Sequence, residues 1–197
     1  AIDDPLGWVR GRRDHLAAEE ADQMRDHERI HLVRGWARLT PKAGDAHVVG
    51  VTGLDGDIHA GVDVRAEHVI ISSGSQPITI SIDGLPAERT LTNENIFDME
   101  SVPATIVVVG GGVISLEMAT AFVDLGAAVH IVELADRLIG TEDPLVSTTI
   151  HAALVDRGVH VHTGTSIERF DEATRTAHLG NGTAINAVDQ VMIGVGR

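Results

Sequence analysis

Three consecutive glycines, Gly110, Gly111 and Gly112, lie between an apolar run and the start of an amphipathic segment. The run at residues 106–109 predicts a buried strand, and residues 113–125 predict a helix. Glycines in such a turn let a pyrophosphate approach the backbone, where the N–H groups and dipole of the helix stabilise it. The turn therefore predicts a dinucleotide site with these cofactor contacts: Gly110, Gly111, Gly112, Val113, Ile114 and Ser115.

Two further positions bear on this prediction. Ser115 replaces the third glycine of the G-x-G-x-x-G fingerprint, a position that serves close packing of helix against strand. Glu133 ends the next apolar strand, where an acid bonds the ribose 2′-hydroxyl and repels a 2′-phosphate, so NAD is favoured over NADP. The alternative is a glycine-rich turn that only packs a strand against a helix. The order of strand, turn, helix, strand and acid favours dinucleotide binding.

The elements that must position this turn predict an α/β fold. Residues 1–30 predict a helix with a thin apolar stripe, and residues 31–74 predict an antiparallel meander with turns at 41–45 and 54–57. Within the meander, residues 69–71 are continuously apolar, which is typical of a strand buried on both faces. Residues 76–103 hold three of the six prolines and predict a connection between domains, with a boundary near residue 80.

The second half predicts a Rossmann-like β-α-β unit followed by antiparallel strands. We expect the helix after the glycines to bury Ile114, Met118, Ala121, Phe122 and Leu125. A second helix is predicted after Asp143 as N-cap and Pro144 as first helical residue, closed by Gly158. Strands are then predicted at residues 159–163, 167–170, 176–179, 184–187 and 188–195, with a hairpin at 180–182.

Composition excludes several classes of function. The formal charge of −14 disfavours nucleic acid and membrane surfaces as partners. The absence of cysteine rules out disulfides, zinc-thiolate sites and thiol chemistry carried by this sequence. With no targeting segment visible, we expect a soluble, cytoplasmic protein.

The glycine turn and Glu133 resemble the NAD(P) domain of the flavoprotein pyridine nucleotide-disulfide oxidoreductases, and are most similar to dihydrolipoyl dehydrogenase. The resemblance extends to AEHVIISSGSQP at residues 66–77, VRGWARL at 33–39, TNENIFDMESVP at 92–103 and VMIGVGR at 191–197. It implies the later part of an FAD-binding domain at residues 1–79 joined to an NAD-binding domain at 80–197. The family's first glycine fingerprint, redox cysteine pair and C-terminal interface domain have no counterpart, so we expect a middle piece of a longer protein, inactive by itself.

The resemblance also implies roles for individual residues. FAD would contact Ala37, Ser73, Gly74 and Ser75, and NAD would additionally contact Ile167 and Gly196. Glu117 would face flavin and nicotinamide as a catalytic residue; the alternative is an ordinary acid on a helix surface. The parent protein would be a homodimer that passes hydride between NADH and FAD and exchanges electrons with a dithiol or disulfide. A non-catalytic NAD-binding module, a mercuric-reductase-like enzyme or another NAD(P)H flavoprotein reductase are the alternatives.

Two histidine pairs could ligate a metal. His160 and His162 share one face of a predicted strand, and His27 and His31 are four residues apart on the predicted first helix. Neither pair has a third ligand identifiable from the sequence, so no metal site is predicted. The sequence also leaves the oxidised substrate open.

Overall fold

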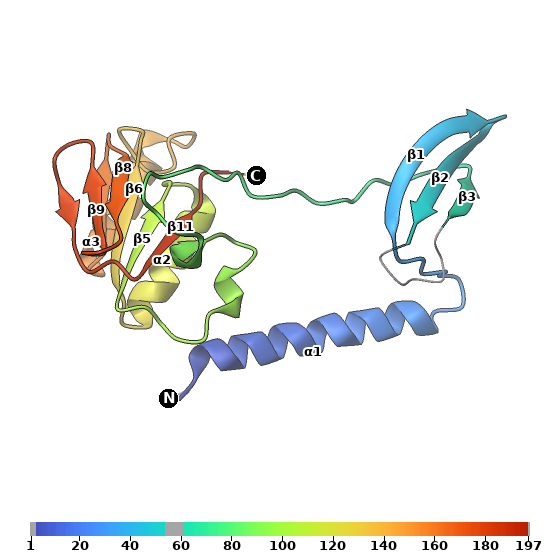
Figure 1. Ribbon diagram of the computed structural model, residues 1–197, viewed down its shortest axis with the longest axis horizontal. Helices are drawn as coiled ribbons and strands as arrows, with labels where there is room; N and C mark the ends of the chain where they lie inside the picture. The colour runs from blue at the N-terminus through green and yellow to red at the C-terminus, as the bar shows by residue number, and fades with distance from the viewer. Residues whose placement is uncertain (1–2, 54–60, 197) are drawn as a thin grey trace. The chain divides into compact units, whose positions relative to one another are not determined.

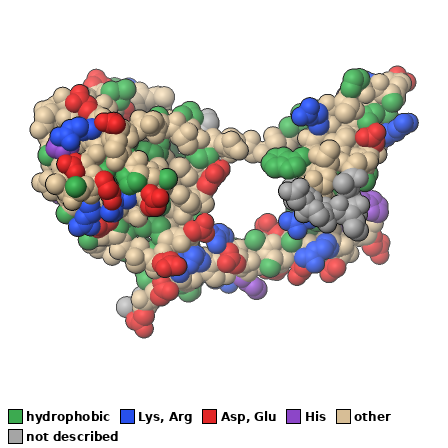
Figure 2. Space-filling model, in the orientation of Figure 1, with side chains coloured by type: hydrophobic (Ala, Val, Ile, Leu, Met, Phe, Trp, Pro, Cys, Tyr) green, Lys and Arg blue, Asp and Glu red, His purple; other side chains and the backbone are tan. Residues whose placement is uncertain are grey.

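The computed structural model describes residues 3–53 and 61–196. The chain divides into two compact units, Gly11–Gly74 and Ser75–Arg197 together with Ala1–Arg10. The predicted N-terminal helix is confirmed as α1 (Pro5–Asp26), and none of its residues is buried. Acidic and basic side chains both line its visible face in Figure 2. Among the described residues, no helix has the length and apolar character needed to cross a bilayer.

The unit Gly11–Gly74 contains a three-stranded antiparallel sheet. Its strands are β1 (Trp36–Ala43), β2 (Ala46–Thr52) and β3 (Val62–Ala66), in that order. Gly44, at φ 64°, makes the turn between the first two strands. The predicted meander is confirmed, while the turn predicted at residues 54–57 lies outside the described residues.

The prediction of a strand at residues 69–71 is wrong. Residues 67–82 form no strand, and Ile70 and Ile71 are 90% and 71% exposed. A strand buried on both faces needs a pairing partner along its length, and no described strand pairs with this segment. Apolar character alone therefore did not produce a strand.

The other unit is organised around a five-stranded parallel sheet (Figure 1). Its order is β4-β11-β5-β6-β7. The strands are β4 (Thr90–Leu91), β11 (Gln190–Ile193), β5 (Thr105–Val109), β6 (Ala128–Glu133) and β7 (His160–Thr163). Ile106, Val107 and Val108 are fully buried, as an apolar run in a two-sided sheet requires. The predicted Rossmann-like α/β arrangement is confirmed.

Two layers cover this sheet. Helices α2 (Val113–Asp124) and α3 (Pro144–Asp156) pack on the face that carries Val108 and Ile131. A small antiparallel sheet packs on the opposite face, which carries Val107 and Val132. Its strands are β8 (Ile167–Asp171), β9 (Thr176–Leu179) and β10 (Ala184–Ile185), and the β9–β10 pairing confirms the predicted hairpin.

The sequence predicted the start of α3 correctly and the buried face of α2 incorrectly. Asp143 caps α3 by accepting a hydrogen bond of 2.8 Å from the backbone N–H of Leu145, and Pro144 is the first helical residue. In α2, the buried residues are Ser115, Leu116, Ala119 and Phe122. Ile114 and Leu125, expected inside, are 39% and 38% exposed. The buried face of α2 packs on β5 and β6, which join Leu116, Ala119 and Phe122 in one apolar cluster.

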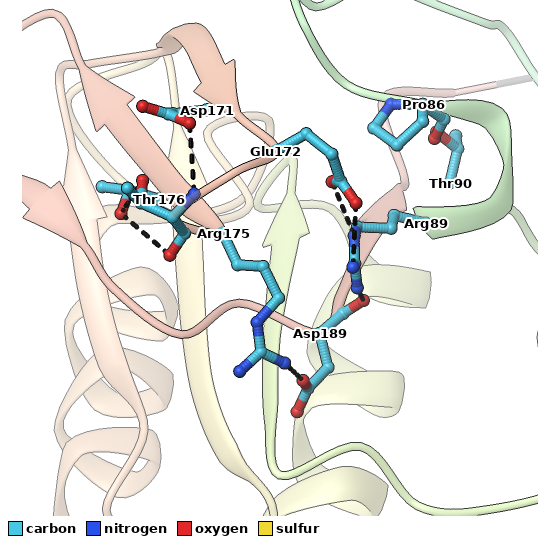
Figure 3. A network of polar contacts seen from close by, with 9 residues as sticks. Pro86, Arg89, Thr90, Asp171, Glu172, Arg175, Thr176 and Asp189 are labelled. Carbon is cyan, nitrogen blue, oxygen red and sulfur yellow. Dashed lines mark hydrogen bonds and ion pairs between the residues drawn. The ribbon is translucent and has the colours of Figure 1, made fainter.

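The segment predicted as a connection supplies β4 and two short 3₁₀ helices, η1 (Ala87–Arg89) and η2 (Ile96–Asp98). Figure 3 shows how it is fastened: Arg89 makes two hydrogen bonds, of 2.7 and 2.9 Å, to the carboxylate of Glu172 and a third, of 3.0 Å, to the carbonyl of Asp189. The Asp189 carboxylate accepts from Arg175 at 2.5 Å and from the backbone N–H of Thr105 at 3.1 Å. These contacts tie η1 and the β8–β9 turn to the start of β5.

Candidate dinucleotide site

A cavity of about 670 Å³ opens at the carboxyl ends of the parallel strands. From β5 the chain adds β6 and then β7 on one side, whereas β11 is added, also in parallel, on the other side of β5. The strand order therefore reverses between β5 and β11. Ligands of open α/β sheets bind at such switch points. The lining residues come from the ends of β5, β6 and β11 and from the segments around them: Ile80, Asn93, residues 109–114, 132–134, Thr165, Ser166 and 192–196.

The glycine turn forms one wall of this cavity. Gly110 has φ 103°, and a Cβ there would lie 2.6 Å from the carbonyl oxygen of Gly194. Its N–H donates to the carbonyl of Val132 at 2.9 Å. Gly110 is therefore required by backbone geometry and by the close approach of β11.

Gly112 has a different role in the same turn. Its backbone is extended, at φ −80° and ψ 171°, and a Cβ there would meet nothing within 4 Å. It is the N-cap of α2 and provides no side-chain cap, in contrast to Asp143 at the start of α3. The first N–H groups of α2 thus lack a side-chain acceptor and adjoin the cavity, as an anion site at a helix N-terminus requires.

Glu133 lies beside the glycine turn, at the end of β6. Its carboxylate accepts hydrogen bonds from the backbone N–H groups of Gly111 and Ala135, the latter at 2.6 Å. A Cβ on Gly111 would lie 3.0 Å from this carboxylate and 2.8 Å from Leu138, so only glycine fits there without displacing them. Glu133, predicted from the sequence as a cofactor contact, lines the cavity, and the structure adds its hydrogen bond to the glycine turn.

The cavity is also lined by residues that sequence reasoning missed. Thr165 is 4% exposed and lines the cavity, and its Oγ1 has no hydrogen-bond partner. Ser166 and Gly194 also line it. The signal that could have identified them is general: the carboxyl ends of parallel strands meet at one edge of the sheet, and these residues follow β7 and β11. An unpartnered buried hydroxyl, free helix amides and a glycine wall fit a bound dinucleotide.

Not every predicted cofactor contact lines the cavity. Gly196 does, together with Val113 and Ile114. Ser115 is fully buried behind the turn, where its Oγ donates to the carbonyl of Gly194 at 3.2 Å, and Ile167 is 9% exposed within the core. Both residues contact cavity-lining residues from their buried side.

Glu117 is exposed on α2 and lines a second hollow, of about 550 Å³, between α2 and α3. This hollow is mostly apolar: Leu116, Ala121, Ile139, Ile150, Ala153 and Leu154 also line it. Glu117 does not line the dinucleotide cavity, although Val113, directly after the glycine turn, lines both hollows.

The residues expected to contact FAD lie in or next to the unit Gly11–Gly74. Ala37 lines a hollow of about 680 Å³ on the β1–β3 sheet, and Ser73, Gly74 and Ser75 are exposed. No helix begins within the described part of residues 11–74, so these described residues offer no helix N-terminus to a flavin pyrophosphate. The described residues of this unit therefore do not by themselves form a site for the flavin pyrophosphate.

The two histidine pairs have different outcomes. Helix α1 ends at Asp26, so His27 and His31 lie beyond it and the expected helical spacing does not apply. His160 and His162 do share a face of β7, and the structure places His130 of β6 against both, with ring centroids 4.6 and 5.5 Å away. In the part of the chain that the structure describes, no group of three ligating side chains is arranged around one ion.

Comparison with known proteins gives consistent relatives. Dihydrolipoyl dehydrogenase of Bacillus subtilis (strain 168) is 36% identical over 140 residues, which cover 70% of this chain and 31% of that protein. Soluble pyridine nucleotide transhydrogenase of Mycobacterium bovis (strain BCG / Pasteur 1173P2) is 31% identical over 191 residues, covering 94% and 39%. The solved structure of LpdA from Mycobacterium tuberculosis superposes with a TM-score of 0.81 at 20% identity, covering all of this chain and 43% of that one.

The chain thus spans about a third of the length of the curated relatives it matches. Residues 11–197 match the family model described as pyridine nucleotide-disulphide oxidoreductase. The flavoprotein disulfide reductase RclA of Escherichia coli has the same fold, with a TM-score of 0.80 at 22% identity, covering 98% of this chain and 43% of that one. The chain belongs to the pyridine nucleotide-disulphide oxidoreductase family.

Proposed function

We propose that this chain binds NAD(H) at the β5–β11 switch point, as part of an FAD-dependent NADH:disulfide oxidoreductase resembling dihydrolipoyl dehydrogenase. The observation that carries the proposal is the juxtaposition of uncapped α2 amides, the Gly110–Gly112 turn and Glu133 around one cavity. Bound NADH would supply a hydride to the flavin of the parent protein. The chain's own residues bind and orient the nucleotide.

Each wall has a defined task in this proposal. The first-turn amides of α2 hold the pyrophosphate, because they are positive, outward-facing and without a side-chain acceptor. Glu133 accepts a hydrogen bond from the adenosine ribose and repels a 2′-phosphate, which favours NADH. The Thr165 hydroxyl gains the partner that it lacks.

Thiol chemistry must come from elsewhere, since this sequence carries no cysteine. The dithiol or disulfide substrate, the homodimer and the cytoplasmic location remain predictions from resemblance and composition. The role of Glu117 beside flavin and nicotinamide is also a prediction, and it requires the cofactors to reach the hollow between α2 and α3.

The test is a fluorescence titration of the purified chain with NADH and, in parallel, NADPH. We expect saturable NADH binding and at least about tenfold weaker NADPH binding, the effect of one unfavourable charge contact. Equal affinities would contradict the role of Glu133, and no saturation with either nucleotide would contradict the site.

A non-catalytic NAD-binding module is the second candidate, supported by the incomplete FAD surface of the described residues. The visible absorbance of the purified chain separates the two. Retained flavin bands support a flavoenzyme segment, and a colourless chain that still binds NADH supports the module.

A further inference from the structure

Residues 194–196, which directly follow β11, line the dinucleotide cavity on the opposite side of β5 from Glu133. In the proposed function, Glu133 accepts a hydrogen bond from the adenosine ribose and the first amides of α2 hold the pyrophosphate. A dinucleotide lies across the switch point of the sheet, so its other half extends toward β11. Residues 194–196 are therefore the part of the cavity that faces the nicotinamide half.

Ser115 fastens these residues to α2. Its side chain is fully buried, and its Oγ donates a hydrogen bond of 3.2 Å to the carbonyl of Gly194. The N–H of Gly194 donates to the carbonyl of Val109 at 2.8 Å. Gly194 is thus held by β5 through its N–H and by α2 through its carbonyl.

The side chain of Ser115 and the absence of one at Gly194 fit each other. A Cβ on Gly194 would lie 2.3 Å from Oγ of Ser115, whereas the nearest Val109 atom, its carbonyl oxygen, would be 3.5 Å away. The G-x-G-x-x-G fingerprint has glycine at the position of Ser115, so that helix and strand approach closely. Here the glycine of this contact lies on the strand side. The close approach is kept, and the serine adds a hydrogen bond that glycine could not make.

We propose that Ser115 is a positioning residue of the dinucleotide site, which holds residues 194–196 in the conformation that receives the nicotinamide half. This inference rests on the proposed function. Ser115 is not among the residues that line the cavity, so it acts through Gly194. Without the hydroxyl, residues 194–196 would adopt the binding conformation for a smaller fraction of the time, and the apparent affinity would fall by that factor. The competing explanation is that Ser115 only fills space between α2 and β11.

Two ligands distinguish these explanations in calorimetric titrations. NADH and ADP-ribose share the adenosine and the pyrophosphate, whereas only NADH carries the nicotinamide. We expect Ser115→Ala to weaken NADH binding about fivefold, the effect of one buried hydrogen bond, and to change ADP-ribose affinity by less than about twofold. Ser115→Gly restores the fingerprint glycine, yet it should weaken NADH binding as Ser115→Ala does. Undiminished NADH affinity in either variant, or equal losses for the two ligands, would overturn the proposal.

Ser147 on α3 provides the matched control. It is 4% exposed, and its Oγ donates to the carbonyl of Leu138 at 2.8 Å. Neither residue lines the cavity. Ser147→Ala should therefore lower the melting temperature, as Ser115→Ala does, but keep the ratio of NADH affinity to ADP-ribose affinity. A changed ratio would show that loss of any buried hydroxyl has this effect, and would refute a specific role of Ser115.

The same titrations separate this inference from the proposed function. If the unsubstituted chain does not bind NADH, the proposed function fails and the inference fails with it. If the unsubstituted chain binds NADH and Ser115→Ala keeps its affinity ratio, only the inference fails.

A pair of melting curves tests the contact without any ligand. Gly194→Ala should lower the melting temperature, because its Cβ would lie 2.3 Å from Oγ of Ser115. In the Ser115→Gly background the Cβ has room, so the same substitution should cost about half as much or less. The double variant should still bind NADH about fivefold more weakly relative to ADP-ribose, because it lacks the hydroxyl. Equal losses of melting temperature in the two backgrounds would contradict the contact, and a double variant with the affinity ratio of the unsubstituted chain would contradict the role of the hydroxyl.

Discussion

Replacing Gly112 by valine should separate ligand binding from folding. The new side chain would occupy the space in front of the first-turn amides of α2, because a Cβ there has no protein atom within 4 Å. A pyrophosphate held by those amides would collide with it. We expect NADH affinity to fall at least about 100-fold, equivalent to about 2.7 kcal/mol.

The same substitution should leave the fold nearly as stable as before. Gly112 has φ −80°, which valine adopts without strain. Loss of a glycine N-cap costs about 1 kcal/mol at most, and reduced freedom of the unfolded chain returns about 0.4–1 kcal/mol. The net change corresponds to a shift in melting temperature of roughly 4 °C or less for a chain of this size.

Gly110→Ala is the matched control within the same turn. Its φ of 103° and the 2.6 Å approach of the Gly194 carbonyl leave no room for a Cβ. We expect this variant to lose at least about 2 kcal/mol of unfolding free energy. NADH fluorescence titration and a circular-dichroism melt of each sample provide both readouts. If Gly112→Val binds NADH like the parent, the glycine turn only packs a strand against a helix, and the reasoning is refuted.

Three further predictions concern other parts of the same unit. Glu133→Ala should weaken NADH binding by about 1.5–3 kcal/mol and reduce the preference for NADH over NADPH, whereas Glu133→Gln should lose less NADH affinity. Titration calorimetry measures both affinities, and an unchanged NADH affinity in Glu133→Ala would contradict the assignment. Asp189→Ala removes the acceptor of the Thr105 N–H and should lower the unfolding free energy by about 1–3 kcal/mol in urea melts. Asp189→Asn should lower it less, and equal losses in the two variants would contradict the role of Asp189 as this acceptor. Burial lowers the folded pKa of His130 to about 4, below its unfolded value of 6.5, so its contribution to stability is complete above pH 6.5 and is lost as pH falls toward 4. His130→Gln should therefore flatten the pH dependence of the melting temperature in that window. The pH-dependent part of the unfolding free energy that it removes should be below about 2 kcal/mol, because the ring is partly solvated. Parallel plots of melting temperature against pH for the variant and the parent would contradict this prediction.

The sequence predicted those features that depend on neighbouring residues. Both ends of α3 were predictable because capping is a local interaction: Asp143 and Pro144 mark its start and Gly158 its end. The glycine turn and Glu133 were found because strand, turn and helix follow one another directly. One wall of the candidate site was therefore predictable.

Features that depend on distant residues were missed. Ile70 and Ile71 are apolar residues typical of a buried strand, yet both are exposed. A strand also needs a second strand to pair with, and the local sequence does not show whether one is present. The buried face of α2 was misjudged because Ser115 is fully buried and donates to the carbonyl of Gly194, a residue far along the chain, whereas periodicity ranked this small polar residue below Ile114. His130 joined the other two histidines only through the register of β6 against β7.

In the proposed function, Glu133 connects the conformation of the glycine turn with the choice of nucleotide. An ionised carboxylate offers about four lone-pair positions, of which the N–H groups of Gly111 and Ala135 take two. The remaining positions can accept a ribose hydroxyl without breaking either bond. The carboxylate that would discriminate against a 2′-phosphate is thus also the one that holds Gly111 in place. A change of specificity toward NADP therefore requires more than removing the negative charge, because the Gly111 N–H must be given another acceptor.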